Sequence, residues 1–302
     1  MKKQLRGIGI ALATPFDEKN RVDFKGLERL TEHVLKEDID YLVLLGTTAE
    51  SATLKNEEKN DIIRCIHSMN KKKVPIVLSI GGNNTEKVIQ KIEQTQIFDF
   101  EAILSIVPYY NRPSQEGIYQ HFKQIVEKTK AKIILYNVPS RTGSNILPKT
   151  VLRLSKEFEN IVAIKEVSGS LIQSYEIIKE KPTHFSVISG DDILALPTIL
   201  GGGDGLISVL GQGFPNVFSK MVHNALEGNV KESFKHYYQM LDLMNLIYKE
   251  GNPSGIKSLL HILNVCESYV RLPIVRASEI LSRKIEEALK RYIKICNKKT
   301  SV

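Results

Sequence analysis

Residues 160–170 read NIVAIKEVSGS and carry a lysine into an apolar segment. Residues 161–164, IVAI, have the composition of a strand that is buried on both faces, and Lys165 continues this strand. Lysine is almost never fully buried unless it is paired or has a chemical role. The segment therefore predicts a buried strand and raises the question of what its lysine does.

Apolar segments of the same kind recur along the chain, separated by amphipathic segments. They are rich in Ile, Val and Leu, and most do not alternate with polar residues, which is typical of parallel strands covered on both faces. Residues 24–38, 56–70 and 114–129 show helical patterns, and Pro148 stands where a first helical turn accepts proline. The expected strands are Gly7–Thr14, Tyr41–Thr47, Pro75–Ile80, Ala102–Pro108, Ile133–Val138, Ile161–Val167, Phe185–Ser189 and Gly205–Leu210.

This alternation of strand and helix predicts an α/β fold, a (β/α)8 TIM barrel. A doubly wound sheet is the competing architecture, but it rarely runs to eight strictly alternating units. From about residue 214 the chain carries more helical pattern than the eighth unit requires. We therefore expect a barrel with the catalytic site over residues 1–225 and a small helical C-terminal extension over residues 226–302.

Composition and charge fit a soluble globular protein. Of 302 residues, 42% are hydrophobic and 25% are charged, and the apolar runs are too short for a membrane-spanning helix. The first residues, MKKQLRGIGIALATPF, look more like a first strand than a signal peptide, and three cysteines without metal-like spacing fit a reducing cytoplasm. The net charge of +8 is spread over helices where Lys alternates with Glu, so we expect no nucleic-acid or membrane partner.

Polar side chains gather at the carboxyl ends of the expected strands, where a barrel builds its active site. Hydroxyls, phenols, one arginine and one lysine therefore converge on one mouth. The segments are GTTAES (46–51), VPYYNRPS (107–114), YNVPSRTG (136–143), KEVSG (165–169), SGDD (189–192) and GLISV (205–209).

Lys165 shares a strand face with Ala163 and Val167, because side chains alternate along a strand. Burial disfavours an ammonium ion, and a neutral amine attacks carbonyl groups to give a Schiff base. The alternative is a lysine that reaches the barrel rim and pairs with Glu166 or an aspartate. The hydroxyls at the neighbouring strand ends favour the Schiff base.

Schiff-base chemistry needs proton transfer, and phenols and hydroxyls at the mouth can supply it. Tyr136 is the expected relay, with Thr47 and Tyr110 as its links toward solvent. A packed ring with a satisfied hydroxyl is the alternative for any one of these tyrosines. Arg141 is suited to gripping a substrate carboxylate, although a solvated surface arginine is its alternative.

The pair Asp191-Asp192 offers a metal-binding alternative at the end of the seventh strand. These residues also suit the start of a helix, where aspartates cap free N–H groups. We expect that capping role, and we expect neither a metal ion nor a cofactor.

The segments GTTAESATL, VPYYNRPSQEG, LYNVPSRTG, AIKEVSG and SGDD, in this order, resemble the dihydrodipicolinate synthase family. This family is part of the pyruvate-dependent class I aldolase and N-acetylneuraminate lyase superfamily. The resemblance runs from about Gly7 to Leu210, and RLP at 271–273 matches a C-terminal element. It implies a metal-independent, Schiff-base-forming lyase on a TIM barrel, usually a homotetramer built as a dimer of dimers. It also implies condensation of pyruvate with aspartate semialdehyde to 4-hydroxy-tetrahydrodipicolinate, in diaminopimelate and lysine biosynthesis.

The resemblance also implies residue roles. Lys165 matches the imine-forming lysine, Tyr136 the proton-relay tyrosine, and Thr47 the threonine beside it. Tyr110 matches a tyrosine that enters a neighbouring subunit's site, and Arg141 matches the arginine that positions the carboxylate of aspartate semialdehyde. The remaining contacts to the keto acid are implied for Thr48, Gly190 and Ile207.

Two departures from the family pattern carry expectations of their own. Ala49 replaces a glycine, so either its φ is negative or the loop is strained. In family members that lysine inhibits, a cleft uses a histidine and a glutamate where this chain has Lys59 and Lys87. We expect insensitivity to lysine, although the other matching cleft positions fit: Ser51, Ala52, Asn83 and Tyr109.

Two competing functions follow from the same residues. A sugar-acid aldolase or N-acetylneuraminate lyase would share the pyruvate imine, but its aldehyde partner needs several polar contacts and this mouth offers one arginine. A catalytically inactive basic barrel would be expected to lack the lysine or the tyrosines, which are all present.

Overall fold

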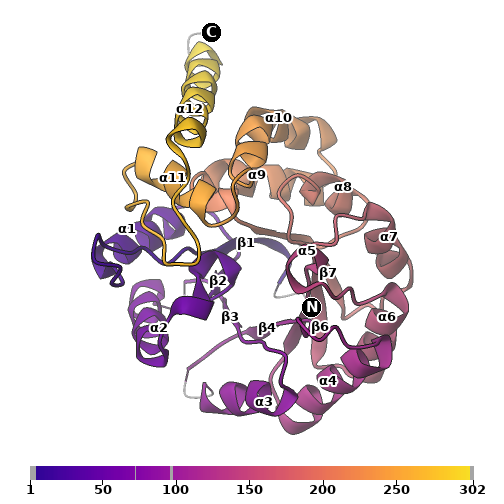
Figure 1. The fold of residues 1–302 in the computed structure, drawn as a ribbon. Helices are drawn as coiled ribbons and strands as arrows, with labels where there is room; N and C mark the ends of the chain where they lie inside the picture. Colours follow the sequence, from indigo (N-terminus) through magenta and orange to yellow (C-terminus); the bar gives the residue numbers. More distant parts are fainter. Residues whose placement is uncertain (1–4, 72, 96–97, 300–302) are drawn as a thin grey trace.

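Eight parallel strands close into a barrel within residues 5–71, 73–95 and 98–299, the part of the chain that the computed structural model describes. Each strand pairs with the next along the chain, and β1 also pairs with β8. Helices surround this ring (Figure 1), so the predicted TIM barrel is confirmed. The strands are β1 (Gly7–Ala11), β2 (Tyr41–Leu44), β3 (Ile76–Ser79), β4 (Ala102–Ile106), β5 (Ile133–Asn137), β6 (Ile161–Glu166), β7 (Ser186–Ser189) and β8 (Gly205–Ser208).

All the expected strands are present, but most end earlier than their apolar segments do. β2 stops at Leu44, whereas the apolar run continued to Thr47, which lies in the 3-10 turn η1 (Thr47–Ala49). The apolar character continues because these residues remain buried at the mouth after they leave the strand ladder. The extra residues at the strand ends therefore form the loops of the site.

Helix starts follow local sequence signals. The side chains of Asp23, Asn84, Ser114 and Ser170 each accept a hydrogen bond from a first-turn N–H, and Pro148 occupies a first turn as predicted. The helices of the barrel layer are α1 (Phe24–Leu35), α2 (Asn56–Asn70), α3 (Thr85–Gln94), α4 (Gln115–Lys128), α5 (Pro139–Thr142), α6 (Pro148–Glu157), α7 (Leu171–Glu180), α8 (Ala195–Leu200) and α9 (Pro215–Leu226), with 3-10 turns η2 (Ser51–Thr53) and η3 (Leu210–Gln212).

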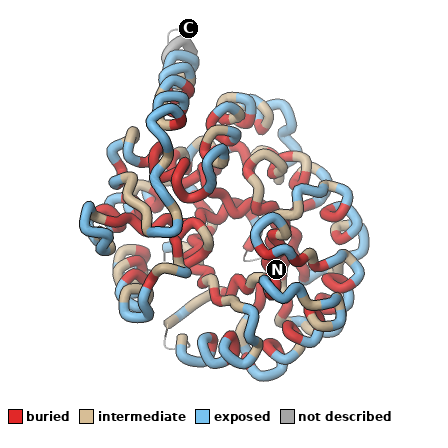
Figure 2. Tube along the Cα trace, in the orientation of Figure 1, coloured by how far each residue is buried: buried red, intermediate tan, exposed pale blue. Residues whose placement is uncertain are grey.

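Two apolar cores lie on opposite faces of the barrel wall. One fills the barrel interior and contains Ala163, Ile188 and Ile207 with the ring of Tyr136. The larger one lies between the strands and the surrounding helices. Figure 2 shows the buried trace along the strands and the inward faces of the helices. Strands covered on both faces explain why their sequences are continuously apolar.

The C-terminal extension packs on one side of the barrel. It comprises α10 (Val230–Leu246), α11 (Ser254–Ile262) and α12 (Glu279–Lys299). α10 packs against α8, α9 and α12, and the far end of α12 points away from the ring in Figure 1. The boundary expected between the barrel and the extension, at residues 225 and 226, falls at the end of α9. This boundary stays a prediction.

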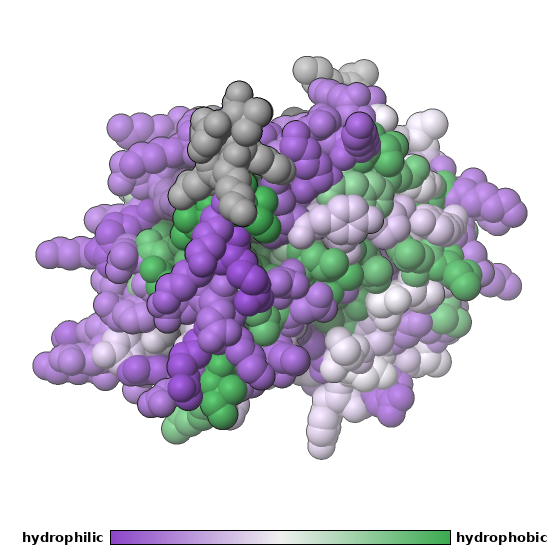
Figure 3. Space-filling view, turned by 90° about the horizontal axis from the view of Figure 1, so that it is seen from above, coloured by the Kyte–Doolittle hydropathy of each residue, from purple (hydrophilic) through white to green (hydrophobic). Residues whose placement is uncertain are grey.

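The surface is largely hydrophilic. Exposed ion pairs join lysine and glutamate one helical turn apart, as in Lys36–Glu32 and Lys290–Glu286. The face in Figure 3 shows several separate apolar groups among hydrophilic residues. None of the helices formed by the described residues is long and apolar enough to cross a membrane.

Candidate active site

Lys165 lies at the carboxyl end of β6, where the strand register pairs it with Tyr136 on β5 and Ile188 on β7. The lysine is only 6% exposed, and its Nζ atom lies 4.6 Å from the centre of the Tyr136 ring. Among the described residues Lys165 forms no ion pair with Glu166 or an aspartate. The alternative of a charge-paired rim lysine is therefore wrong, and a buried amine faces a phenol ring.

Glu166 points to the other side of β6, because neighbouring residues of a strand face opposite ways. Its carboxylate accepts hydrogen bonds from the Asn137 amide at 3.1 Å to each oxygen, from the Ser168 N–H at 2.6 Å and from the Gln173 amide at 3.0 Å. These donors satisfy a buried carboxylate without a cation. The network fixes the loop after β6 and leaves Lys165 to the barrel interior.

Gly190 closes against the Lys165 side chain. A Cβ atom at Gly190 would lie 2.4 Å from Cγ2 of Val167 and 2.5 Å from Cε of Lys165, so these side chains would have to shift to admit it. Ile207, on β8, is fully buried and belongs to the same interior cluster as Tyr136. The structure therefore gathers Lys165, Tyr136, Gly190 and Ile207 around one end of the barrel.

The two threonines expected at the site follow β2 in η1. The Thr48 hydroxyl accepts a hydrogen bond from the Asn252 amide at 2.9 Å. Ala49 is not among the residues with positive φ, and Glu50, with φ 53°, takes the left-handed position instead. Of the two alternatives for Ala49, the unstrained one is confirmed. The loop accepts alanine because the sharp turn falls one residue later.

Arg141 is exposed on the short helix α5, beyond the end of β5. Its guanidinium donates to the backbone carbonyl of Asn252 at 3.5 Å. Asn252 thus touches both Thr48 and Arg141, although it lies in the connection between α10 and α11. Sequence reasoning missed this asparagine because nothing in the local pattern places it at the barrel mouth.

Tyr110 is not brought to Lys165 within one chain. Its side chain is 88% exposed and its φ is 74°, while Tyr109 is 40% exposed. Arg112 ties this loop to the loop of Arg141, donating to the Gly143 carbonyl at 2.9 Å. A largely exposed phenol next to the mouth is free to contact another molecule.

The expectation that Asp191 and Asp192 both cap a helix is wrong. α8 begins only at Ala195, and Asp191 instead accepts the N–H of Ile193 at 2.8 Å. Asp192 is fully buried and accepts bonds from neighbouring elements. Its burial depends on β8 and the C-terminal extension, which the local sequence does not reveal.

A buried ion pair supports the threonine loop from the extension. Nζ of Lys257, on α11, lies 2.5 Å from Oε1 of Glu50, and both side chains are fully buried. The second Glu50 oxygen accepts the N–H of Arg271 at 2.8 Å. Nζ of Lys257 also donates to the Tyr269 carbonyl at 2.8 Å. The extension therefore holds the residue that makes the turn after Thr48.

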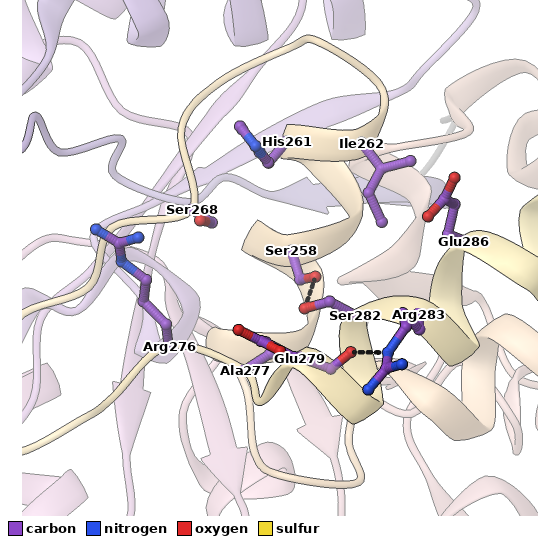
Figure 4. A pocket seen from close by; sticks show the side chains of 10 residues that line it. All are labelled: Ser258, His261, Ile262, Ser268, Arg276, Ala277, Glu279, Ser282, Arg283 and Glu286. Atoms are coloured by element: carbon purple, nitrogen blue, oxygen red, sulfur yellow. Dashed lines mark hydrogen bonds between the residues drawn. The ribbon is translucent and has the colours of Figure 1, made fainter.

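A cavity of about 490 Å³ lies elsewhere, between α11 and α12 (Figure 4). Ser258 and Ser282 form a hydrogen bond across it at 2.9 Å. Its charged groups have other partners, since His261 pairs with Glu267 and Arg276 stacks on an aromatic ring. None of the expected site residues lines this cavity.

Comparison with known proteins identifies the family of this chain. The model of the dihydrodipicolinate synthetase family matches residues 4–292. The chain belongs to this family. It is therefore an enzyme of the lyase class, built on the barrel that the dihydrodipicolinate synthetase family shares.

Individual relatives of the dihydrodipicolinate synthetase family cover nearly the whole chain. The 4-hydroxy-tetrahydrodipicolinate synthase of Karelsulcia muelleri (strain GWSS) is 51% identical over 94% of this chain and 96% of its own length. The chloride-inhibited dihydrodipicolinate synthase of Acinetobacter baumannii, solved with pyruvate, is 33% identical with a TM-score of 0.92, covering 95% of this chain and 99% of that one. The Cyanidioschyzon merolae enzyme, solved with lysine bound, is 31% identical with a TM-score of 0.92, covering 96% and 99%.

Proposed function

We propose that this enzyme condenses pyruvate with L-aspartate 4-semialdehyde through a Schiff base at Lys165. The product is 4-hydroxy-tetrahydrodipicolinate, an intermediate of diaminopimelate and lysine biosynthesis. The observation that carries the proposal is the buried amine of Lys165, which has no acidic partner among the described residues and faces Tyr136. The relatives named above, one of which binds pyruvate, support the same chemistry.

The reaction begins on pyruvate. The neutral Lys165 amine attacks the keto carbon, a C–N bond forms, and the keto oxygen takes up protons and leaves as water. The resulting cationic imine withdraws electrons from the adjacent methyl group, which loses a proton and gives an enamine. A buried site favours this sequence because it limits the access of water to the imine.

The enamine then joins the two substrates. Its terminal carbon attacks the aldehyde carbon of aspartate semialdehyde, and the aldehyde oxygen takes up a proton to become the hydroxyl. The amino group of the former semialdehyde attacks the imine carbon and displaces Lys165, so the ring closes and the free enzyme returns.

The remaining site residues bind and move protons. Tyr136 is adjacent to Lys165 and is suited to carry protons to and from the reacting oxygen. Thr47 and Tyr110 extend this relay, and Thr48 and the backbone at Gly190 and Ile207 hold the keto acid. Arg141 is exposed at the mouth and is suited to grip the second substrate's carboxylate.

We further propose a homo-oligomeric enzyme, a tetramer built as a dimer of dimers, that works in the cytoplasm. The 88% exposed Tyr110 phenol supports this arrangement, because the relay needs it and its own chain does not bring it to Lys165. Mixing Tyr110→Phe subunits with Lys165→Ala subunits, each of low activity alone, is expected to restore activity in hybrids. Hybrids without any recovered activity would contradict a shared site.

Borohydride reduction with pyruvate tests the central step. The wild type is expected to gain the mass of pyruvate less water plus two hydrogens, and peptide mapping should place it on Lys165. Lys257, the other buried lysine among the described residues, serves as the internal control and should remain unmodified. Adduct on another lysine, or none, contradicts the mechanism. Turnover with aspartate semialdehyde but not with sugar aldehydes separates the synthase from sugar-acid lyases.

A further inference from the structure

A buried carboxyl lies behind the barrel mouth and takes no part in the steps above. Asp192 is 0% exposed, and its Oδ1 atom accepts a hydrogen bond from the Ser208 hydroxyl at 2.5 Å. Its Oδ2 atom accepts the N–H of Leu210 at 3.0 Å and the phenol of Tyr248 at 3.4 Å. These three donors come from β8, η3 and the C-terminal extension, so the carboxyl is the point where these segments meet.

Tyr248 links this carboxyl to the catalytic phenol. It follows α10, and its hydroxyl interacts electrostatically with both Asp192 and Tyr136. Burial raises the pKa of Tyr248 well above its usual value, and the Asp192 carboxylate raises it further. The phenol of Tyr248 therefore stays protonated. It donates a hydrogen bond to Asp192 and lies near Tyr136.

The carboxyl also lies close to the substrate-facing backbone. Gly190, two residues before Asp192, packs directly on the side chain of Lys165. Ser208, whose hydroxyl Asp192 binds, directly follows Ile207 on β8. A change in the charge of Asp192 therefore acts at short range on the residues expected to hold the keto acid.

We propose that Asp192 and Tyr248 form a buried acid–phenol pair that acts on the imine at Lys165 and sets the acid limb of the reaction's pH profile. Tyr248 is a positioning residue, because it touches Asp192 and not the substrate. The inference rests on the proposed function, since it concerns the imine at Lys165.

The electrostatic reason is the cation that forms on Lys165. The protonated imine draws electrons from the bound keto acid, and a negative charge on Asp192 stabilises that cation. When Asp192 takes up a proton, this stabilisation disappears and imine chemistry slows.

The pH at which this occurs follows from the burial of Asp192. Burial raises its pKa to about 6, Asp191 adds to the rise, and the hydrogen bonds from Ser208 and from the Leu210 N–H act in the opposite direction. The other titratable groups facing this region are Tyr237 on α10, whose pKa is raised by burial and by Asp191, and the site pair Tyr136 and Lys165. Removing a donor to the carboxylate destabilises its ionised form, so the acid limb should move to higher pH.

The test compares pH profiles of pyruvate trapping and of turnover in Tyr248→Phe with the wild type. The loss of one long hydrogen bond to a charged group predicts an upward shift of the acid limb by about half a pH unit, with the rate on the plateau kept within about twofold. Tyr237→Phe is the matched control. Its phenol donates to the backbone carbonyl of Ile193 at 3.0 Å, on the same loop, and does not touch Asp192. This variant should keep the wild-type limb.

The outcomes distinguish failure of the role inferred for Asp192 and Tyr248 from failure of the proposed function. An unshifted limb in Tyr248→Phe, or a rate lowered equally at every pH, overturns the inference while wild-type trapping still supports the imine at Lys165. No trapping by the wild type overturns both. Asp192→Asn should flatten the acid limb of the pH profile. Its result is interpreted together with that of Tyr248→Phe, because the asparagine amide cannot accept hydrogen bonds from all of the donors that Asp192 binds.

Discussion

The buried ion pair between Lys257 and Glu50 joins the C-terminal extension to the loop of the site threonines. Both side chains are 0% exposed, and the Nζ–Oε1 distance is 2.5 Å. Burial lowers the pKa of Lys257, and the Glu50 carboxylate opposes that shift. In Lys257→Met the aliphatic volume remains, but the buried charge of Glu50 then has the Arg271 N–H as its one remaining donor among the described residues. Such an uncompensated charge costs about 3–5 kcal/mol of the free energy of unfolding.

The melting temperature reports this loss directly. An unfolding entropy of about 2.1 cal/mol/K per residue gives roughly 0.6 kcal/mol/K for 302 residues, so Lys257→Met should melt about 5–8 °C lower. The double variant Lys257→Met/Glu50→Gln removes both charges and should recover most of that loss. Lys290→Met is the matched control on the same extension, because its partner Glu286 is exposed and the pair contributes less than about 1 kcal/mol.

Two results would refute this reasoning. The first is a melting temperature of Lys257→Met no lower than that of Lys290→Met, which would mean that the buried pair contributes no more than a surface pair. The second is a double variant as unstable as the sum of its single variants, because the stranded charge would then not be the cause.

Three further changes have defined outcomes. Gly190→Ala should slow pyruvate trapping roughly a hundredfold with little change in the melting temperature, because a Cβ atom would lie 2.5 Å from the Cε atom of the site lysine; trapping at the wild-type rate would contradict this close contact. Initial rates should not respond to submillimolar lysine. Lys87, at the position of the family's glutamate, would replace attraction of the ligand's ammonium with repulsion, and Lys59 would add a second like charge, each interaction being roughly 4 kcal/mol before screening. Calorimetric binding of lysine in that concentration range would contradict this. The hydrogen bond from His223 to Asp40 raises the pKa of the histidine, so its stabilisation is complete below about pH 6.5 and is lost as the pH rises through the raised value. Urea midpoints of wild type and His223→Gln should therefore differ most below about pH 6.5 and converge as the pH rises above it, and a constant gap would count against this prediction.

The chain's local patterns determined the barrel and much of its mouth. Continuous apolar runs of strand length predicted every strand, because strands buried on both faces carry no polar alternation. Lys165 was identifiable because an ionisable side chain inside such a run is rare, and the barrel rule placed it at the carboxyl end of its strand. The spacing of apolar residues, the burial preference of each residue and the direction of each strand all depend on residues that are neighbours in the chain. The sequence alone therefore contains this information.

Only the tertiary structure decided which distant residues support that mouth. Glu50 and Lys257 are 207 positions apart, and Asp192 meets Tyr248 from 56 positions away. Asp192 looked like a helix cap because its own neighbours suit one, yet β8 and the extension enclose it and α8 starts later. A buried polar group acquires its hydrogen-bond partners when the layers of the fold pack together. The local spacing of apolar residues does not indicate which layer will face that group. That is why the strands were predictable, while the carboxyls, amides and phenols packed behind the barrel mouth were not.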